Sequence, residues 1–169
     1  LEHLTILAPT LNTTVDYIMY GKTESEENVK EYRPITRMLP VLTHVQCGSM
    51  TNVRSISPHE IEQWLPGPPE AGKNGFYLIT QGVSNSPYFN DGEFICIDPD
   101  VDFNSVQTGE MIVVCQDDEA TFKALVRDFN KIYLKALNEN FQPNIIPLKE
   151  NAEYKGKYVG KFTPSKKFI

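Results

Sequence analysis

Short runs of β-branched and aromatic residues, separated by turn signals, recur along most of this chain. They occupy residues 41–45, 76–80, 93–97, 111–115, 121–127, 132–136 and 158–162. The segments between them include Asp91-Gly92, Thr108-Gly109 and Asp128-Phe129-Asn130, which favour tight turns. Runs of this length and spacing are typical of strands joined in hairpins, so the sequence predicts an all-β domain. A helical turn is expected only within residues 57–65, and Pro66-Gly67-Pro68-Pro69 would end it and begin a loop.

The start of the chain has a different period. In residues 1–21 the apolar positions are spaced by three and four, which predicts two short helices, with Gly21 ending the second. Residues 22–35 are polar and acidic, as in an exposed linker. The predicted organisation is therefore a helical segment at 1–21, a linker at 22–35 and a β-domain at 36–169.

Composition excludes several classes of protein. The chain has 169 residues, of which 40% are hydrophobic and 22% charged, as expected of a folded globular protein. It contains neither the roughly 18 successive apolar residues of a membrane span nor the pattern of a secretory signal, so we expect a cytoplasmic protein without a membrane partner. A net charge of -6 argues against binding nucleic acid through this chain alone. The basic cluster Lys161, Lys166 and Lys167 is expected to be a solvated tail.

The three cysteines are widely spaced and form no C-x-x-C pair. Neither a disulfide framework nor a zinc site is therefore expected, and no cofactor or metal is indicated. Cys96 and Cys115 lie in apolar runs, where a free thiol packs like a small apolar side chain. Cys47 lies outside such a run and is followed by Gly48.

Two residues are candidates for nucleophilic chemistry. Ser84 follows a predicted strand at a corner that would expose its hydroxyl and leave backbone N–H groups free, and a serine nucleophile needs a base within hydrogen-bond reach. No histidine has a suitable setting, but Lys123 lies on a predicted strand whose two faces are largely apolar, and burial lowers the pKa of a lysine. Local sequence leaves other interpretations open: Ser84 as a turn serine, Ser86 as an equal competitor, and Lys123 as a solvent-exposed residue of an edge hairpin.

The order of several motifs resembles a known family. They are Gly82-Val83-Ser84, Asp91-Gly92-Glu93, Ile97-Asp98-Pro99, Gly109-Glu110-Met111, the run at 120–125, the run at 133–138 and Tyr158-Val159-Gly160. Over about residues 36–169 this set is similar to the self-cleaving domain of LexA-type and CI-type phage repressors. The resemblance implies a mainly β autopeptidase domain preceded by a helical remnant of a helix-turn-helix domain. It also implies that Ser84, rather than Ser86, is the nucleophile, that Lys123 is its base, and that the chain cuts its own Cys47-Gly48 bond once.

The sequence departs from the family pattern at two places. Family members usually have Gly-Asp-Ser-Met where this chain has Val83 and Asn85 around Ser84, which is compatible with a slow or tuned dyad. The cut bond is more often Ala-Gly, and Cys47-Gly48 is similar to the variant in UmuD-type members. Glycine after the cut bond allows the sharp turn that a self-docking loop requires.

Residues 1–21 resemble the end of a Cro/CI-type helix-turn-helix domain, with the recognition helix expected before Leu1. The chain is thus expected to be a repressor truncated within its DNA-binding domain, so that only the full-length protein binds operator DNA. The implied partners are a second copy, forming a homodimer, and a RecA filament as co-protease.

Three alternative functions remain at this point. The main one is a non-cleaving dimerisation module of a repressor, controlled by an antirepressor protein. A Ser/Lys protease acting on other proteins is disfavoured by the missing membrane anchor and by the internal Cys47-Gly48. A polymerase-accessory role of the UmuD kind is disfavoured by the helix-turn-helix remnant.

Overall fold

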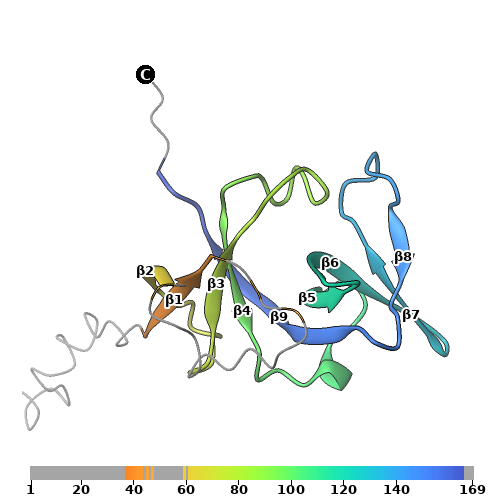
Figure 1. The fold of residues 1–169 in the computed structure, drawn as a ribbon, viewed down its shortest axis with the longest axis horizontal. Coiled ribbons are helices and arrows are strands. Elements are labelled where there is room, and N and C mark those ends of the chain that lie inside the picture. Colours follow the sequence, from red (N-terminus) through yellow and green to blue (C-terminus); the bar gives the residue numbers. More distant parts are fainter. Residues whose placement is uncertain (1–36, 44, 46, 48–58, 60, 166–169) are drawn as a thin grey trace, which may run out of the picture. The chain divides into compact units, whose positions relative to one another are not determined.

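The chain folds into a mainly β domain, as the sequence predicts (Figure 1). A computed structural model describes residues 37–43, 45, 47, 59 and 61–165. Its strands are β1 Met38–Leu42, β2 Ile61–Pro66, β3 Phe76–Ile79, β4 Phe94–Asp98, β5 Met111–Gln116, β6 Glu119–Asp128, β7 Lys131–Lys135, β8 Ile145–Pro147 and β9 Glu153–Phe162. A 3-10 turn covers Phe103–Ser105. The helices expected in 1–21 and the linker expected at 22–35 lie outside the described residues.

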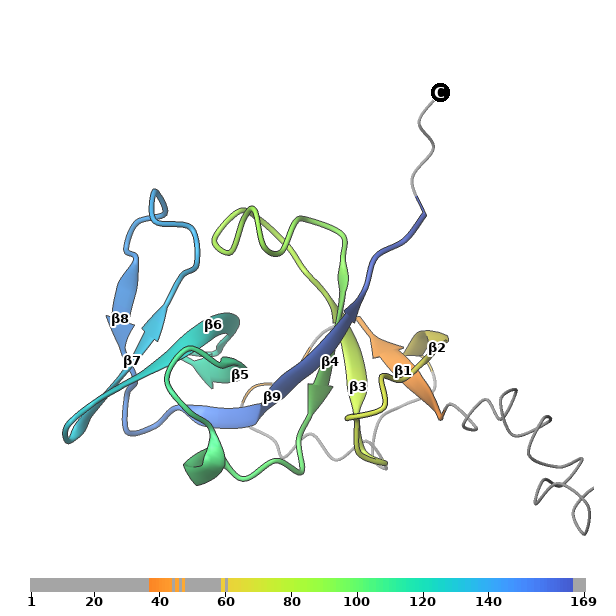
Figure 2. The same cartoon turned by 180° about the vertical axis from the view of Figure 1, so that it is seen from behind.

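All of these strands belong to one 9-stranded sheet with the order β2-β1-β3-β4-β9-β5-β6-β7-β8. Neighbours are antiparallel except β1 and β3, which pair in parallel where Val41 lies opposite Tyr77. Strand β9 runs through the middle of the sheet and pairs with β4 through its second half and β5 through its first (Figures 1 and 2). Within the described residues, no helix is long and apolar enough to cross a membrane.

A glycine allows β9 to change partners. Gly156 has a φ of +151°, and a Cβ added there would lie 2.7 Å from the carbonyl oxygen of Asp98 and 2.6 Å from Ile97 Cγ2. Only a residue without a side chain lets β9 approach β4 this closely. Near Gly156, β9 therefore connects the strands on its β4 side (β2, β1, β3 and β4) to those on its β5 side (β5, β6, β7 and β8).

Two sequence predictions about secondary structure are wrong. Of the helical turn expected at 57–65, the described His59 is in 3-10 conformation, but residues 61–65 belong to strand β2, which pairs antiparallel with β1. In this pairing Leu65 lies opposite Leu39, and both pack into one apolar cluster. Contacts with β1 therefore determine the conformation of this segment. Strand β1 ends at Leu42 instead of Val45, and strand β8, which pairs with β7, was not expected from the sequence.

The core lies on both faces of β5. Met111, Val113 and Cys115 face one cluster of buried residues, while Ile112 and Val114 face another. This alternation is that of a strand covered on both sides. Cys96 is a fully buried free thiol, as predicted.

The terminal basic cluster is not simply a solvated tail. Lys161 lies on β9, and its Nζ donates to the carbonyl of Tyr88 at 2.9 Å and approaches the buried carboxylate of Glu93 at 3.3 Å. The positive charge offsets the cost of burying that carboxylate. Lys161 therefore fastens the loop between β3 and β4, while Lys166 and Lys167 lie outside the described residues.

Candidate active site

Among the described residues, the first half of β6 has a strand partner on one edge only. Its residues from Glu119 to Lys123 pair with β5 on one side, whereas β7 joins the other side only from Ala124 onward. The loop that follows β3 and carries Ser84 lies against this edge. Both cartoons show this loop on the same side of the sheet as the loop between β7 and β8 (Figures 1 and 2).

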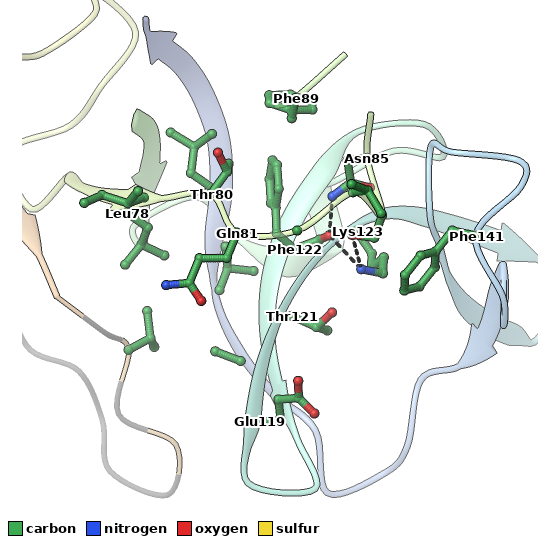
Figure 3. A pocket seen from close by; sticks show the side chains of 18 of the residues that line it. Leu78, Thr80, Gln81, Asn85, Phe89, Glu119, Thr121, Phe122, Lys123 and Phe141 are labelled. Atoms are coloured by element: carbon green, nitrogen blue, oxygen red, sulfur yellow. Dashed lines mark hydrogen bonds between the residues drawn. The ribbon is translucent and has the colours of Figure 1, made fainter. Parts of the chain in front are cut away.

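A pocket of about 560 Å³ opens where these segments meet (Figure 3). It is lined by residues from several segments, among them Thr43, Val45, Gln81, Ser84, Glu119 and Phe141. Thr43 and Val45 belong to the segment that leads from β1 to Cys47. The pocket thus brings the chain just before Cys47 close to Ser84.

The structure brings Ser84 and Lys123 together. Lys123 Nζ donates a hydrogen bond to Ser84 Oγ at 2.9 Å and a second to the carbonyl oxygen of Phe122 at 3.3 Å (Figure 3). The ring of Phe141 covers the amine, with its centroid 5.5 Å from Nζ. Ser86, the competing serine, instead has its Oγ 3.3 Å from the side-chain oxygen of Asn90. Among the two serines, Ser84 alone contacts the lysine.

Burial lowers the pKa of Lys123 below its ordinary value, because loss of water disfavours the ammonium form. The carboxylate of Glu119 opposes this by favouring the charged form, but it is the smaller effect. The side chain therefore does not extend freely into solvent from an edge hairpin. A neutral amine within hydrogen-bond reach of a serine hydroxyl can accept its proton.

Two asparagines that the sequence did not single out as functional hold the Ser84 loop. Asn138, in the loop after β7, donates its backbone N–H to the carbonyl of Ser84 at 3.0 Å and its side-chain amide to the carbonyl of Val83 at 2.9 Å. Asn85 is buried and donates to the Phe122 carbonyl at 2.8 Å. The position of Asn85 next to Ser84 could have marked it as a candidate site residue. Asn138 is too far from Ser84 in the sequence to be identified in this way.

The cysteines differ from the prediction. Cys115 is buried on β5 as expected, yet it is bonded to Cys47 as a disulfide, with a Cα–Cα distance of 5.4 Å. Spacing along the sequence could not reveal this pair, because 68 residues separate its members and only folding brings them together. Cys47 packs against the core but is not among the residues lining the pocket. Gly48 lies outside the described residues.

The other candidate groups do not enter the site. His59 is exposed and does not line the pocket, while His3 and His44 lie outside the described residues. In the part of the chain that the structure describes, no group of three or more histidine, cysteine, aspartate or glutamate side chains could hold a metal ion.

Comparison with known proteins identifies the family of this chain. A family model described as Peptidase S24-like matches residues 40–159, which include most of the sheet and all of the pocket. The chain therefore belongs to the Peptidase S24-like family.

Relatives of the chain are named as repressors and transcriptional regulators. The HTH-type transcriptional regulator for conjugative element R391 of Providencia rettgeri is 32% identical over 132 residues, which cover 73% of this chain and 59% of that protein. Repressor protein C2 of Salmonella phage P22 is 28% identical, over 83% of this chain and 67% of its own. The LexA repressor of Mannheimia succiniciproducens is 39% identical over 41% of this chain and 32% of its own length. This chain spans about three fifths of the length of the conjugative-element regulator.

The lowered pKa of Lys123 makes stability depend on pH. Between that lowered value and the ordinary lysine pKa of about 10.4, the unfolded chain binds more protons than the folded chain, so the free energy of unfolding rises with pH. We expect Ser84→Ala, which keeps the amine, to gain stability between about pH 7 and pH 9.5 relative to the double variant Ser84→Ala/Lys123→Met. Urea denaturation of both variants at the two pH values measures this difference. Parallel pH dependence in the two variants would show that the folded chain does not disfavour the ammonium.

Proposed function

We propose that this chain is the self-cleaving part of a transcriptional repressor of the LexA/CI type. It acts as an intramolecular serine autopeptidase that cuts its own Cys47-Gly48 bond in a single turnover. The observation that carries this proposal is the 2.9 Å hydrogen bond between the half-buried amine of Lys123 and Ser84 Oγ. Membership of the Peptidase S24-like family supports a peptidase, and the pocket supports action in cis because Thr43 and Val45 line it beside Ser84.

The reaction begins with proton transfer. Neutral Lys123 accepts the hydroxyl proton of Ser84 as the serine oxygen attacks the carbonyl carbon of Cys47. The carbonyl of Phe122 accepts a hydrogen bond from the same amine, which leaves the nitrogen lone pair to be directed at the serine. The new C–O bond turns the carbonyl oxygen of Cys47 into an oxyanion.

Backbone N–H groups beside the nucleophile stabilise that oxyanion. In the described part of the chain, the N–H groups of Ser84 and Asn85 donate to no other protein group, whereas those of Ser86 and Phe89 are bonded to the carbonyls of Val83 and Asn85. Free donors at a turn can point at a developing negative charge without reorganising. Ser84 and Asn85 are the donors that the local geometry offers.

The tetrahedral intermediate then breaks the Cys47–Gly48 bond. Protonated Lys123 gives its proton to the nitrogen of Gly48, which leaves as a new amino terminus, and Cys47 remains as an ester on Ser84. Water, activated by the again neutral amine, hydrolyses the ester and restores the hydroxyl. The products are residues 1–47 and 48–169.

A well-oriented intramolecular nucleophile has an effective molarity on the order of 10^5 M. Self-cleavage must therefore be slowed for an intact repressor to persist. If the segment around Cys47 occupied the pocket about 1% of the time, the observed rate would fall about 100-fold. In the proposed cycle an activated RecA filament favours the docked state. Cleavage separates the operator-binding half from the half that forms the homodimer. Each DNA-binding domain then binds DNA alone instead of as one of a linked pair, so the affinity for the operator falls. The expected compartment is the cytoplasm.

Alkaline pH tests the dyad without any partner. Intact chain incubated at about pH 10, where more of the Lys123 side chain is neutral, should split into two fragments on denaturing gels. Ser84→Ala and Lys123→Ala should stay whole, whereas Ser86→Ala should be cut at the rate of the unaltered chain. Mass spectrometry of the fragments should place the break after Cys47.

Cleavage that survives in Ser84→Ala or Lys123→Ala, or a break elsewhere, would contradict the proposed mechanism. An unaltered chain that stays whole both at high pH and with activated RecA filaments would favour the alternative function, a dimerisation module controlled by an antirepressor.

A further inference from the structure

The side chain of Asn85 links the nucleophile loop to the strand that carries the lysine. It is 6% exposed, and its amide nitrogen donates to the carbonyl oxygen of Phe122 at 2.8 Å (Figure 3). Its amide oxygen accepts from the backbone N–H of Leu137 at 3.2 Å. A buried amide with both ends bonded fixes the distance between the segments it joins. Asn85 therefore ties Ser84 to β6 and to the chain after β7.

The Phe122 carbonyl is shared. Its oxygen accepts from Asn85 at 2.8 Å and from Lys123 Nζ at 3.3 Å, so its two lone pairs serve one donor each. The shorter bond fixes the orientation of the Phe122 peptide. The position of this carbonyl in turn sets where the amine of Lys123 can lie, since the amine donates to the same oxygen.

We propose that Asn85 is a positioning residue for the Ser84/Lys123 pair, acting through the Phe122 carbonyl. This rests on the proposed self-cleavage. The departure from the family's Gly-Asp-Ser-Met at this position is thereby given a role: the amide anchors the base as well as the nucleophile. The other charged residues lining the pocket are Asp118 and Glu119, and neither contacts Asn85 through a hydrogen bond in the described part of the chain.

The variant Asn85→Asp separates the two contacts. It keeps an oxygen for the N–H of Leu137 but replaces the donor to Phe122 with an acceptor, and it places a negative charge near Lys123. We expect cleavage about 10- to 100-fold slower at a given pH and a pH–rate midpoint displaced to higher pH. Asn138→Ala is the matched control, because it loosens Val83 without touching Phe122: the rate should fall but the midpoint should stay.

A titration of the Lys123 side-chain nitrogen by 15N NMR supplies a readout that does not need cleavage. The Lys123 pKa should be higher in Asn85→Asp than in Asn138→Ala. An unchanged midpoint and pKa in Asn85→Asp would overturn the positioning role. A chain in which Ser84 cuts nothing would overturn the proposed function, while the NMR titration would still decide the effect of Asn85 on the lysine.

The disulfide carries a second, independent inference. Cys47 is the residue before the proposed cut bond, and its sulfur is joined to that of Cys115 on β5. Cys115 lies opposite Ala120 in the β5–β6 register, so the bond holds Cys47 against β5, the strand that pairs with the other edge of β6. The pocket lining includes Thr43 and Val45 but neither cysteine.

Attack requires the carbonyl carbon of Cys47 to come within about 3–3.5 Å of Ser84 Oγ. Cys115 is 3% exposed on β5, so the disulfide restricts how far Cys47 can move toward that position. Disulfides in proteins of the reducing cytoplasm are mostly transient and sense redox state. The location of this one, at the cut bond, makes it suited to that use.

We infer that the Cys47–Cys115 disulfide is a redox gate on self-cleavage, closed when oxidised and open when reduced; this also rests on the proposed function. In closing, a small-molecule disulfide takes two electrons from the two thiols, forms the protein S–S bond through a mixed disulfide and leaves as two thiols. In opening, a dithiol reductant attacks the protein disulfide and is itself oxidised to a disulfide. Cys96 takes no part, because it is fully buried and unpaired.

The gate is tested on the whole chain treated with oxidised glutathione or with dithiothreitol. Intact mass of the cleavage-deficient Ser84→Ala variant should be about 2 Da lower after oxidation. The unaltered chain at about pH 10 should be cut about tenfold or more slowly when oxidised. Cys115→Ala should be cut at one rate under both treatments, and Cys96→Ala should keep the difference.

Equal cleavage rates of the oxidised and reduced unaltered chain, or no mass loss on oxidation, would overturn the gate alone. Failure of the reduced chain to cleave would overturn the proposed function and the gate with it.

Discussion

The hydrogen bond between Lys123 Nζ and Ser84 Oγ is the interaction on which the site depends. It joins residues 39 positions apart, one on a strand and one on a loop, at 2.9 Å. Its chemical value comes from burial: an amine that has lost water, and is covered by the ring of Phe141, gives up its proton more easily than an exposed lysine. The same pair in solvent would be an ordinary hydrogen bond with no reactivity.

The described strands create this environment by leaving one edge of β6 without a strand partner over part of its length. Because β7 pairs with β6 only from Ala124 onward, the backbone of the preceding residues is open to the Ser84 loop. Asn85 and Asn138 use that opening to fix the loop, and Gly156 allows β9 to hold the two groups of strands together. The pocket is therefore a consequence of strand lengths as much as of the residues in it.

Much of the fold could be predicted from the sequence, because period-two runs between turn signals identify strands directly. The strands at 76–80, 111–115 and 121–127 were found this way and differ from β3, β5 and β6 only at their ends. Strand β2 could not be found, since its conformation comes from pairing with β1 rather than from its own pattern.

The proximity of two of the predicted site residues is what the structure adds, and their role stays a prediction. Ser84 and Lys123 were selected by the order of surrounding motifs, and the structure brings them within hydrogen-bond distance. The contacts that hold them could not be predicted. Asn138 is 55 residues from Val83, and Cys115 is 68 residues from Cys47. Only folding brings these residues together, and a single sequence does not indicate contacts between such distant positions. For the cysteines this produced an error: their spacing suggested free thiols, and the fold pairs two of them.

The central claim is that nucleophile and cut bond belong to the same molecule, and the order of the reaction tests it most directly. The fraction of reduced chain cleaved at about pH 10 can be followed over about a 100-fold range of protein concentration. Cleavage in cis predicts one first-order rate constant at every concentration, and no cutting of Ser84→Ala when it is mixed with active chain. A rate constant that rises in proportion to concentration, together with cutting of Ser84→Ala in the mixture, would contradict it.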